Sequence, residues 1–159
     1  MEFSPQSRVW IYQADKLLST EEQLHIKNKL QNFVTAWTAH SDSLKSSFNI
    51  IHDRFVILIV DETLVKASGC SIDKSVNLMK EMGNTLGVNF FNRFNISYRK
   101  NNGEITSCSR EDFEKRVASG EVTKKTLVFN NLITQLDELS NNWEIPFENS
   151  WHQQVFDIK

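Results

Sequence analysis

A run of six apolar residues, FVILIV at positions 55–60, constrains the fold of this chain more strongly than any other segment. It is far shorter than the roughly 20 residues that a membrane-spanning helix needs. A half-buried strand alternates apolar and polar residues, so an unbroken apolar run of this length indicates burial on both faces. We therefore predict a β-strand in the middle of a sheet.

Two strands and a helix are expected before this run. Residues 9–12 (VWIY) have the β-branched and aromatic composition of a half-buried strand, and residues 48–51 are a second strand candidate. Ser19 and Glu22 have the spacing of a capping box, which predicts the start of a helix. The expected inner stripe of this helix follows the 3.6-residue period and consists of Leu24, Leu30, Phe33, Val34 and Trp37.

A second helix is expected to begin near Cys70 or Ser71. Gly83 and Gly87 are its candidate ends, because glycine adopts the left-handed conformation that often ends a helix. Its expected inner stripe consists of Ile72, Val76, Met79, and Met82 or Leu86.

The remaining elements complete an α+β pattern. A strand at residues 94–98 makes the order β-α-β-β-α-β, which is typical of a ferredoxin-like core with both helices on one face of an antiparallel sheet. Asn101-Asn102-Gly103 predicts a hairpin to 104–106, and Ser109 and Gly120 predict the two ends of a short helix. A strand at 126–129 and a helix over 132–139 follow. Because no linker or repeat divides the chain, we expect one domain over residues 1–159.

Charge and cysteine content narrow the classes of partner. With 18 basic and 20 acidic residues, the net charge of −2 supplies no excess positive field for nucleic acid or anionic membranes, so we expect neither as a partner. The start of the chain lacks the pattern of a signal peptide, and two cysteines are too few for a disulfide framework, so we expect a cytoplasmic location. No C-x-x-C pair or H-x-x-x-H spacing occurs, so neither a metal nor a cofactor is expected.

The segment ASGCSID at positions 67–73 is the most informative candidate site. If a helix starts here, its first amides lack carbonyl partners and the helix dipole adds positive potential. Ser68, Gly69 and Ser71 would let a small anion approach these amides, and Lys66 would add a charge. Ser, Gly and Asp are also ordinary capping residues, so a purely structural cap is the alternative.

Cys70 in the same segment is a candidate nucleophile, because helix-start amides stabilise a thiolate. His40 is the candidate base, with His52 and His152 as alternatives. Asp73 would either orient the base or simply complement the helix dipole in the first turn. No spacing pairs any of these histidines with Cys70. A buried cysteine that packs as a small apolar residue is the structural alternative.

Three other segments have both a functional and a structural interpretation. Residues 37–40 (WTAH) would place an aromatic ring and an imidazole together as a site candidate, or would end the first helix with His40 as a cap at the negative end of its dipole. Trp151 and His152 would either line a ligand pocket or fix the end of the chain to the core. Asp61 and Glu62 would be either catalytic carboxylates or a solvated turn.

Five segments together resemble a family of small uncharacterised bacterial proteins, mostly from Bacteroidetes, whose members are frequently labelled "ABC transporter ATPase". The resemblance extends over nearly the whole chain, and ASGCSIDKSV is its most specific part. The segments lie at positions 9–13 (VWIYQ), 33–40 (FVTAWTAH), 60–62 (VDE), 67–76 (ASGCSIDKSV) and 150–152 (SWH).

The residues do not fit the ATPase label of that family. An ABC ATPase needs a G-x-x-x-x-G-K-[ST] loop, and this chain has none; its Gly69 is followed by CSID. The resemblance implies a bacterial, cytoplasmic protein and brings no catalytic residue with it.

These observations leave three functional hypotheses. The first is a nonenzymatic module that binds a small anion at residues 68–73. The second is a cysteine-dependent enzyme or redox-responsive thiol protein that uses Cys70. The third is an interaction module that presents Trp143 and Trp151 to a protein partner.

Overall fold

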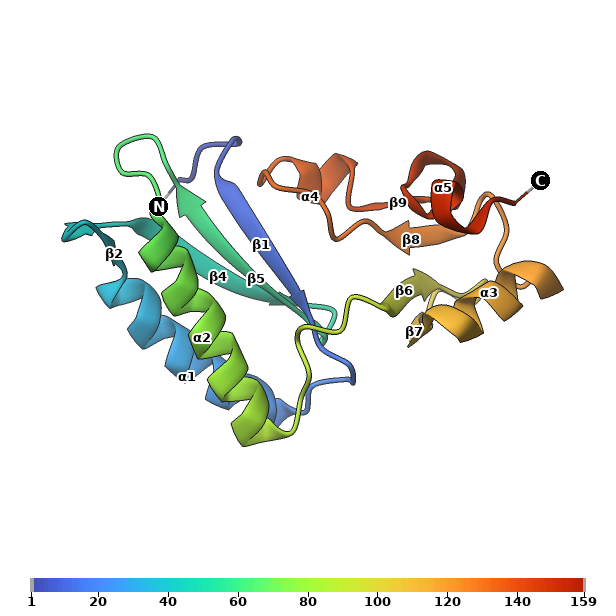
Figure 1. Ribbon diagram of the computed structural model, residues 1–159, viewed down its shortest axis with the longest axis horizontal. Coiled ribbons are helices and arrows are strands. Elements are labelled where there is room, and N and C mark those ends of the chain that lie inside the picture. Colours follow the sequence, from blue (N-terminus) through green and yellow to red (C-terminus); the bar gives the residue numbers. More distant parts are fainter. Residues whose placement is uncertain (1, 159) are drawn as a thin grey trace. The chain divides into compact units, whose positions relative to one another are not determined.

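The computed structural model describes residues 2–158 as an α+β protein with antiparallel sheets, in agreement with the predicted class. The chain forms two compact units (Figure 1). The first contains the chain up to Phe91 together with Thr134–Asp137, and the second contains Asn92–Ile133 and the chain from Glu138 onward. The expectation of one domain stays a prediction.

The first unit is built on a sheet with the predicted apolar strand at its centre. The order is β1 (Arg8–Gln13), β5 (Phe55–Asp61), β4 (Lys45–Ile51), and both pairings are antiparallel. Four successive residues of β5, Phe55 to Leu58, have 0% exposure, so both of its faces are buried. This confirms the prediction from the apolar run.

Helices α1 (Thr20–Ala36) and α2 (Gly69–Leu86) lie along the same face of this sheet (Figure 1). The capping box of Ser19 and Glu22 is present, as predicted. Ile26 and Leu30 are the fully buried residues of α1, whereas Leu24 is 59% exposed, so its place on the inner stripe was wrong. Leu24 precedes Ile26 by two residues, about 200° around the helix, and so lies on the opposite side.

Helix α2 ends at Gly87, which has φ 68° and is the predicted left-handed cap. Gly83, the other candidate end, lies inside the helix and is buried. The buried positions on the inner face of α2 are Ser71, Ser75, Met79 and Met82, whereas the predicted Ile72 and Val76 are half-buried. Both serine hydroxyls donate to carbonyls of the preceding turn, Ser71 to Ser68 (2.8 Å) and Ser75 to Ile72 (2.6 Å). The hydroxyls are therefore buried without losing hydrogen bonds.

The predicted strand at 94–98 is present as β6 (Asn95–Arg99), but it belongs to a second sheet. Beside β1 lies the segment Thr134–Asp137 instead. Arg8 and Gln135 form an antiparallel bridge, the Val9 amide donates to the Thr134 carbonyl (3.0 Å), and the Leu136 amide donates to the Ser7 carbonyl (2.8 Å). The sheet order therefore does not confirm the ferredoxin-like topology. The order of elements along a chain does not say which sheet a strand will join.

The second unit has the sheet order β7 (Ile105–Ser109), β6, β8 (Leu127–Phe129), β9 (Glu144–Pro146). The β6–β7 hairpin confirms the predicted turn, with Gly103 at φ 87°. Helix α3 (Arg110–Ser119) begins after its cap Ser109 and ends at Gly120, as predicted.

The helix predicted over 132–139 is not formed. Only α4 (Glu138–Asn141) is helical there, because residues 134–136 are hydrogen-bonded alongside the start of β1. The end of the described chain consists of β9, a 3₁₀ turn η1 (Phe147–Asn149) and α5 (His152–Phe156). Phe113, Phe147 and His152 pack together in the core of this unit.

Candidate functional site

The first turn of α2 has a reciprocal cap. Ser68 is the N-cap, with φ −98° and ψ 166°; its hydroxyl accepts from the Ser71 amide (3.1 Å), while the Ser71 hydroxyl accepts from the Ser68 amide (2.7 Å). The predicted helix start is thus present, one or two residues earlier than expected. Ser71 is 1% exposed and its hydroxyl is used by the cap, so it does not present a free donor to a ligand.

Two amides at this helix start are free. Gly69 and Cys70 occupy the first two helical positions, and within residues 2–158 neither amide has a hydrogen-bond partner. Both residues are exposed, and a Cβ built on Gly69 has nothing within 4 Å. These amides, at the positive end of an 18-residue helix, are available to an acceptor from outside the chain.

A small hairpin that the sequence did not predict lies against this helix start. It consists of β2 (Thr38–Ala39) and β3 (Asp42–Ser43), joined by His40 and Ser41, which have φ of 50° and 70°. Helix α1 ends at Ala36, so the prediction of His40 as its cap was wrong. The reason is that Trp37 leaves the helix in an extended conformation and buries its indole elsewhere.

Trp37 fixes the hairpin to α2. Its indole Nε1–H donates to the Ser71 carbonyl (2.9 Å), and both groups are buried. The indole also packs against Phe33, with ring centroids 4.8 Å apart, and against Trp10 at 6.2 Å. This anchor holds His40 close to the start of α2.

A pocket of about 340 Å³ lies between the hairpin and the loop that leads into α2. Its polar lining consists of His40, Asp42, Lys66 and Ser68. The apolar lining consists of Ala39, Leu64, Val65 and Ala67, of which Leu64 is 93% exposed. The structure therefore brings together three of the predicted site residues, His40, Lys66 and Ser68.

The two acidic residues at the end of β5 shape the loop that carries Lys66. Asp61 accepts from the Thr63 hydroxyl (2.6 Å) and from the amides of Ser4 and Thr63 (both 3.0 Å), and these bonds hold the pKa of its carboxyl well below its usual range. Glu62 accepts from the Ala67 amide (2.8 Å). Both carboxylates thus have structural partners, which the solvated-turn interpretation did not anticipate.

Cys70 is an exposed thiol. Within the described residues no hydrogen bond joins Cys70 to His40, His52 or His152. His52 lies in the turn before β5, so the seven residues of that strand, roughly 20 Å, separate it from the end that leads to α2. Asp73 is exposed and lies two residues beyond Ser71, the second residue of the capping box.

Trp151 and His152 lie in the second unit and do not line this pocket. The His152 ring is 1% exposed, stacks on Trp151 with centroids 3.8 Å apart, and its Nδ1 is 2.7 Å from the Ser150 hydroxyl. Burial lowers the pKa of His152 to about 4, so the ring is neutral at physiological pH. This environment agrees with the structural interpretation of the segment, an anchor for the end of the chain.

The two tryptophans of the interaction hypothesis, Trp143 and Trp151, differ in how far they are exposed to a partner. Trp143 is 4% exposed, and its Nε1–H donates to the Asn131 side chain (2.9 Å). Trp151 is half-buried. Trp143 thus offers no free indole to a partner.

Sequence reasoning missed Asp42 and the apolar wall of the pocket. The only sequence signal for the hairpin was the polar stretch after Trp37, and that pattern is equally typical of a loop. In the part of the chain that the structure covers, no group of three His, Cys, Asp or Glu residues could hold a metal ion, and no helix is long and apolar enough to cross a membrane.

Comparison with known proteins gives no relative for this chain: no family model, curated protein or solved structure matches it.

Proposed function

We propose that the first unit is a nonenzymatic module that binds a small oxyanion, such as a phosphate or carboxylate, at the start of α2. The observation that carries this proposal is the pair of free amides of Gly69 and Cys70, next to a pocket lined by Lys66, His40 and Ser68. Backbone amides at a helix start bind anions because donors and dipole point the same way.

The charges around the pocket favour the binding of an anion, with modest affinity. Lys66 has no ion-pair partner among residues 2–158, so its charge is available to a ligand. Asp42 lines the same pocket and opposes a second negative charge. Surface charges are screened within about 8 Å at physiological salt, so we expect binding to weaken as salt rises.

Gly69→Pro tests the proposal directly. Proline suits the first position of a helix, and the extended Ser68 (ψ 166°) is compatible with a following proline, so the helix should form while the Gly69 amide is lost. Gly69→Ala is the matched control, because it keeps the amide and meets no atom within 4 Å. A hydrogen bond to a charged group contributes about 1.5–3 kcal/mol, so we expect at least roughly tenfold weaker phosphate binding in the proline variant only.

Calorimetric titration with phosphate, sulfate and acetate at constant ionic strength measures this difference. Lys66→Met should also weaken binding, whereas Lys74→Met, an exposed lysine on α2 outside the pocket, should not. Equal affinities for the proline and alanine variants would overturn the proposal, as would the absence of binding by any of the three anions.

A thiol function of Cys70 is the second candidate, and the exposure of Cys70 favours it. Cys108 is an internal control, because it is buried and burial raises the pKa of its thiol. Mass spectrometry after iodoacetamide treatment should find Cys70 labelled and Cys108 protected in the folded chain. If Cys70 is catalytic, its thiol should react with iodoacetamide at neutral pH faster in the folded chain than in the urea-unfolded chain. Asp73→Asn or His40→Gln should slow this reaction. A Cys70 that reacts no faster than in the unfolded chain removes this candidate.

For the fold of the first unit we propose a ferredoxin-like variant in which Thr134–Asp137 takes the edge position beside β1. The order β1-β5-β4, the two helices on one face and the antiparallel bridge at Gln135 support this assignment. A cytoplasmic location stays a proposal, supported by the two unpaired cysteines. The resemblance to the bacterial family stays a prediction.

A further inference from the structure

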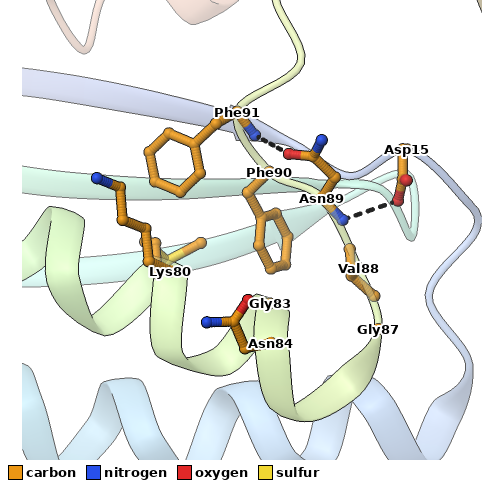
Figure 2. Close-up of a pocket in the computed structure, with 10 residues that line it drawn as sticks. Asp15, Lys80, Gly83, Asn84, Gly87, Val88, Asn89, Phe90 and Phe91 are labelled. Carbon is orange, nitrogen blue, oxygen red and sulfur yellow. Dashed lines mark hydrogen bonds between the residues drawn. The ribbon is translucent and has the colours of Figure 1, made fainter.

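A second and larger pocket, of about 550 Å³, lies at the other end of α2 (Figure 2). Its floor is made by Met79, Gly83, Val88 and Phe90, all buried. The side chains at its rim are exposed, and all but one aromatic ring are polar. The rim residues that the argument uses are Asp15, Lys80, Asn84, Asn89 and Phe91.

The wall of this pocket is fixed by hydrogen bonds. After the left-handed Gly87, the Val88 amide donates back to the Gly83 carbonyl (2.9 Å), which turns the chain onto the helix. Two hydrogen bonds join Asp15 and Asn89. The Asp15 amide donates to the Asn89 carbonyl (3.1 Å), and the Asn89 amide donates to Asp15 Oδ1 (3.0 Å). The Phe91 amide donates to the Asn89 side chain (2.8 Å; Figure 2). The pocket is therefore part of the folded unit and not a loose end of the helix.

Four rim side chains keep polar atoms that have no hydrogen-bond or ion-pair partner among the described residues. Within residues 2–158 these atoms are the second carboxylate oxygen of Asp15, the Lys80 ammonium, the Asn84 amide and the Asn89 amide nitrogen. Lys80 Nζ lies 5.7 Å from the centre of the Phe91 ring, a cation–π distance, and Phe91 is 40% exposed. The pocket thus presents one negative and one positive group together with an apolar floor.

The two charges lie on opposite sides of Phe90 in Figure 2. The last carbonyls of α2 precede Gly87, which lines the pocket, and they add negative potential at this end of the helix. A ligand with a single charge would satisfy one side and leave the opposite charge without a partner.

We propose that this pocket binds a small zwitterion, with its ammonium group at Asp15, its acidic group at Lys80 and an apolar spacer over Phe90. The Asn89 amide nitrogen can donate a hydrogen bond to the acidic group, and the Asn84 amide can donate to the acidic group or accept from the ammonium group. This site is independent of the oxyanion site at the start of α2, because the two pockets share no residue.

Titration with a length series of ω-amino acids, from glycine to 6-aminohexanoate, tests the proposal on the full chain. Alkylamines and alkyl carboxylates of matched length serve as single-charge controls. We expect at least one ω-amino acid to bind at least tenfold more tightly than both of its controls. Lys80→Met should lose this preference, whereas Lys74→Met, on α2 but outside the pocket, should keep it.

Asp15→Asn gives a second, milder variant, because asparagine can still accept from the Asn89 amide and so preserve the wall. It should lose the preference for the ω-amino acid over the alkyl carboxylate. The proposal is overturned if no member of the series binds more tightly than its controls, or if both variants bind it like the original chain. Gly69→Pro should leave this binding unchanged, which separates the result from that of the oxyanion site.

Discussion

At the scale of single residues, the two glycines of α2 have different physical roles. A Cβ on Gly69 would meet nothing within 4 Å, so this glycine leaves the helix start open. A Cβ on Gly83 would lie 2.5 Å from the Val88 carbonyl oxygen, closer than van der Waals contact allows. The chain that returns over α2 after Gly87 can therefore approach the helix only because residue 83 has no side chain.

Gly83→Ala should destabilise the protein, and Gly69→Ala should not. Overpacking costs about 1–3 kcal/mol, and the better helix propensity of alanine returns up to about 1 kcal/mol, so we expect a net loss near 1–2 kcal/mol at position 83. At position 69 the same change should stabilise by about 0.4–1 kcal/mol. Urea denaturation followed by circular dichroism measures both. Equal stabilities for the two variants would contradict the close approach at Gly83.

At the scale of elements, two hairpins turn through pairs of residues with positive φ and no glycine. His40 and Ser41 join β2 to β3, and His52 and Asp53 are the first two of the three residues that join β4 to β5. Two-residue turns with this backbone usually contain Asn or Gly, because most side chains are strained there. His and Asp are among the residues that tolerate the conformation, whereas Ser41 has no such preference.

Ser41→Gly should stabilise the protein by about 1 kcal/mol, the usual cost of a left-handed residue with a side chain. Asp53→Gly should gain less, because the Asp53 carboxylate accepts from the Gln23 side chain (2.9 Å) and this bond would be lost. Thermal denaturation of the two variants compares them directly. A larger gain at position 53 than at position 41 would contradict this account.

At the scale of the whole molecule, the two units differ in what their cores contain. The core of the first unit is made of aliphatic, methionine and aromatic residues from the sheet, from α1 and α2, and from the segments that follow β1 and α2. The aromatic cluster of the second unit includes His152, which packs against Phe113 and Phe147 and is held at Nδ1 by Ser150. A titratable ring in a packed core links the stability of the protein to pH.

Acidification should therefore begin to destabilise the protein near pH 6.5, above the pH at which carboxylates titrate. The pKa of His152 is lowered to about 4 in the folded chain, against 6.5 for an ordinary histidine, so above pH 6.5 the ring is neutral in both states. Between these values only the unfolded chain takes up the proton, and stability falls as pH falls, by about 3 kcal/mol in all.

The free energy of unfolding measured from pH 7.5 to 4 tests this slope. His152→Phe should remove most of it, and His25→Gln, which changes a histidine of α1 outside the aromatic cluster, should keep it. An unchanged slope in His152→Phe would show that other groups cause the acid sensitivity.

Most predictions that rested on neighbouring residues were confirmed, the cap by His40 being an exception. The cap at Ser19, the left-handed Gly87 and Gly120, and the turn at Gly103 each depend on a few adjacent side chains and backbone angles. The helix start at Ser68 belongs to the same class. Of the candidate site, the segment 66–70 could therefore be found from sequence.

Predictions that needed distant partners were wrong or incomplete. The helix over 132–139 was not formed because its backbone bonds to residues 7–9. The predicted stripe of α1 included Leu24, although the periodic pattern also fitted Ile26. His40 lies at the pocket because its hairpin is fixed by the hydrogen bond from Trp37, just before β2, to the Ser71 carbonyl in α2.

The sequence by itself determined the central strand, the ends of α2 and α3 and the α+β class, because apolar runs, caps and glycine conformations act over a few residues. Only the tertiary structure decided which sheet each strand joined, that Lys66, His40 and Ser68 line one pocket, and that Lys80 and Asp15 line another. The physical reason is that these arrangements depend on packing and hydrogen bonds between residues tens of positions apart, whose pairing leaves no pattern in a single sequence.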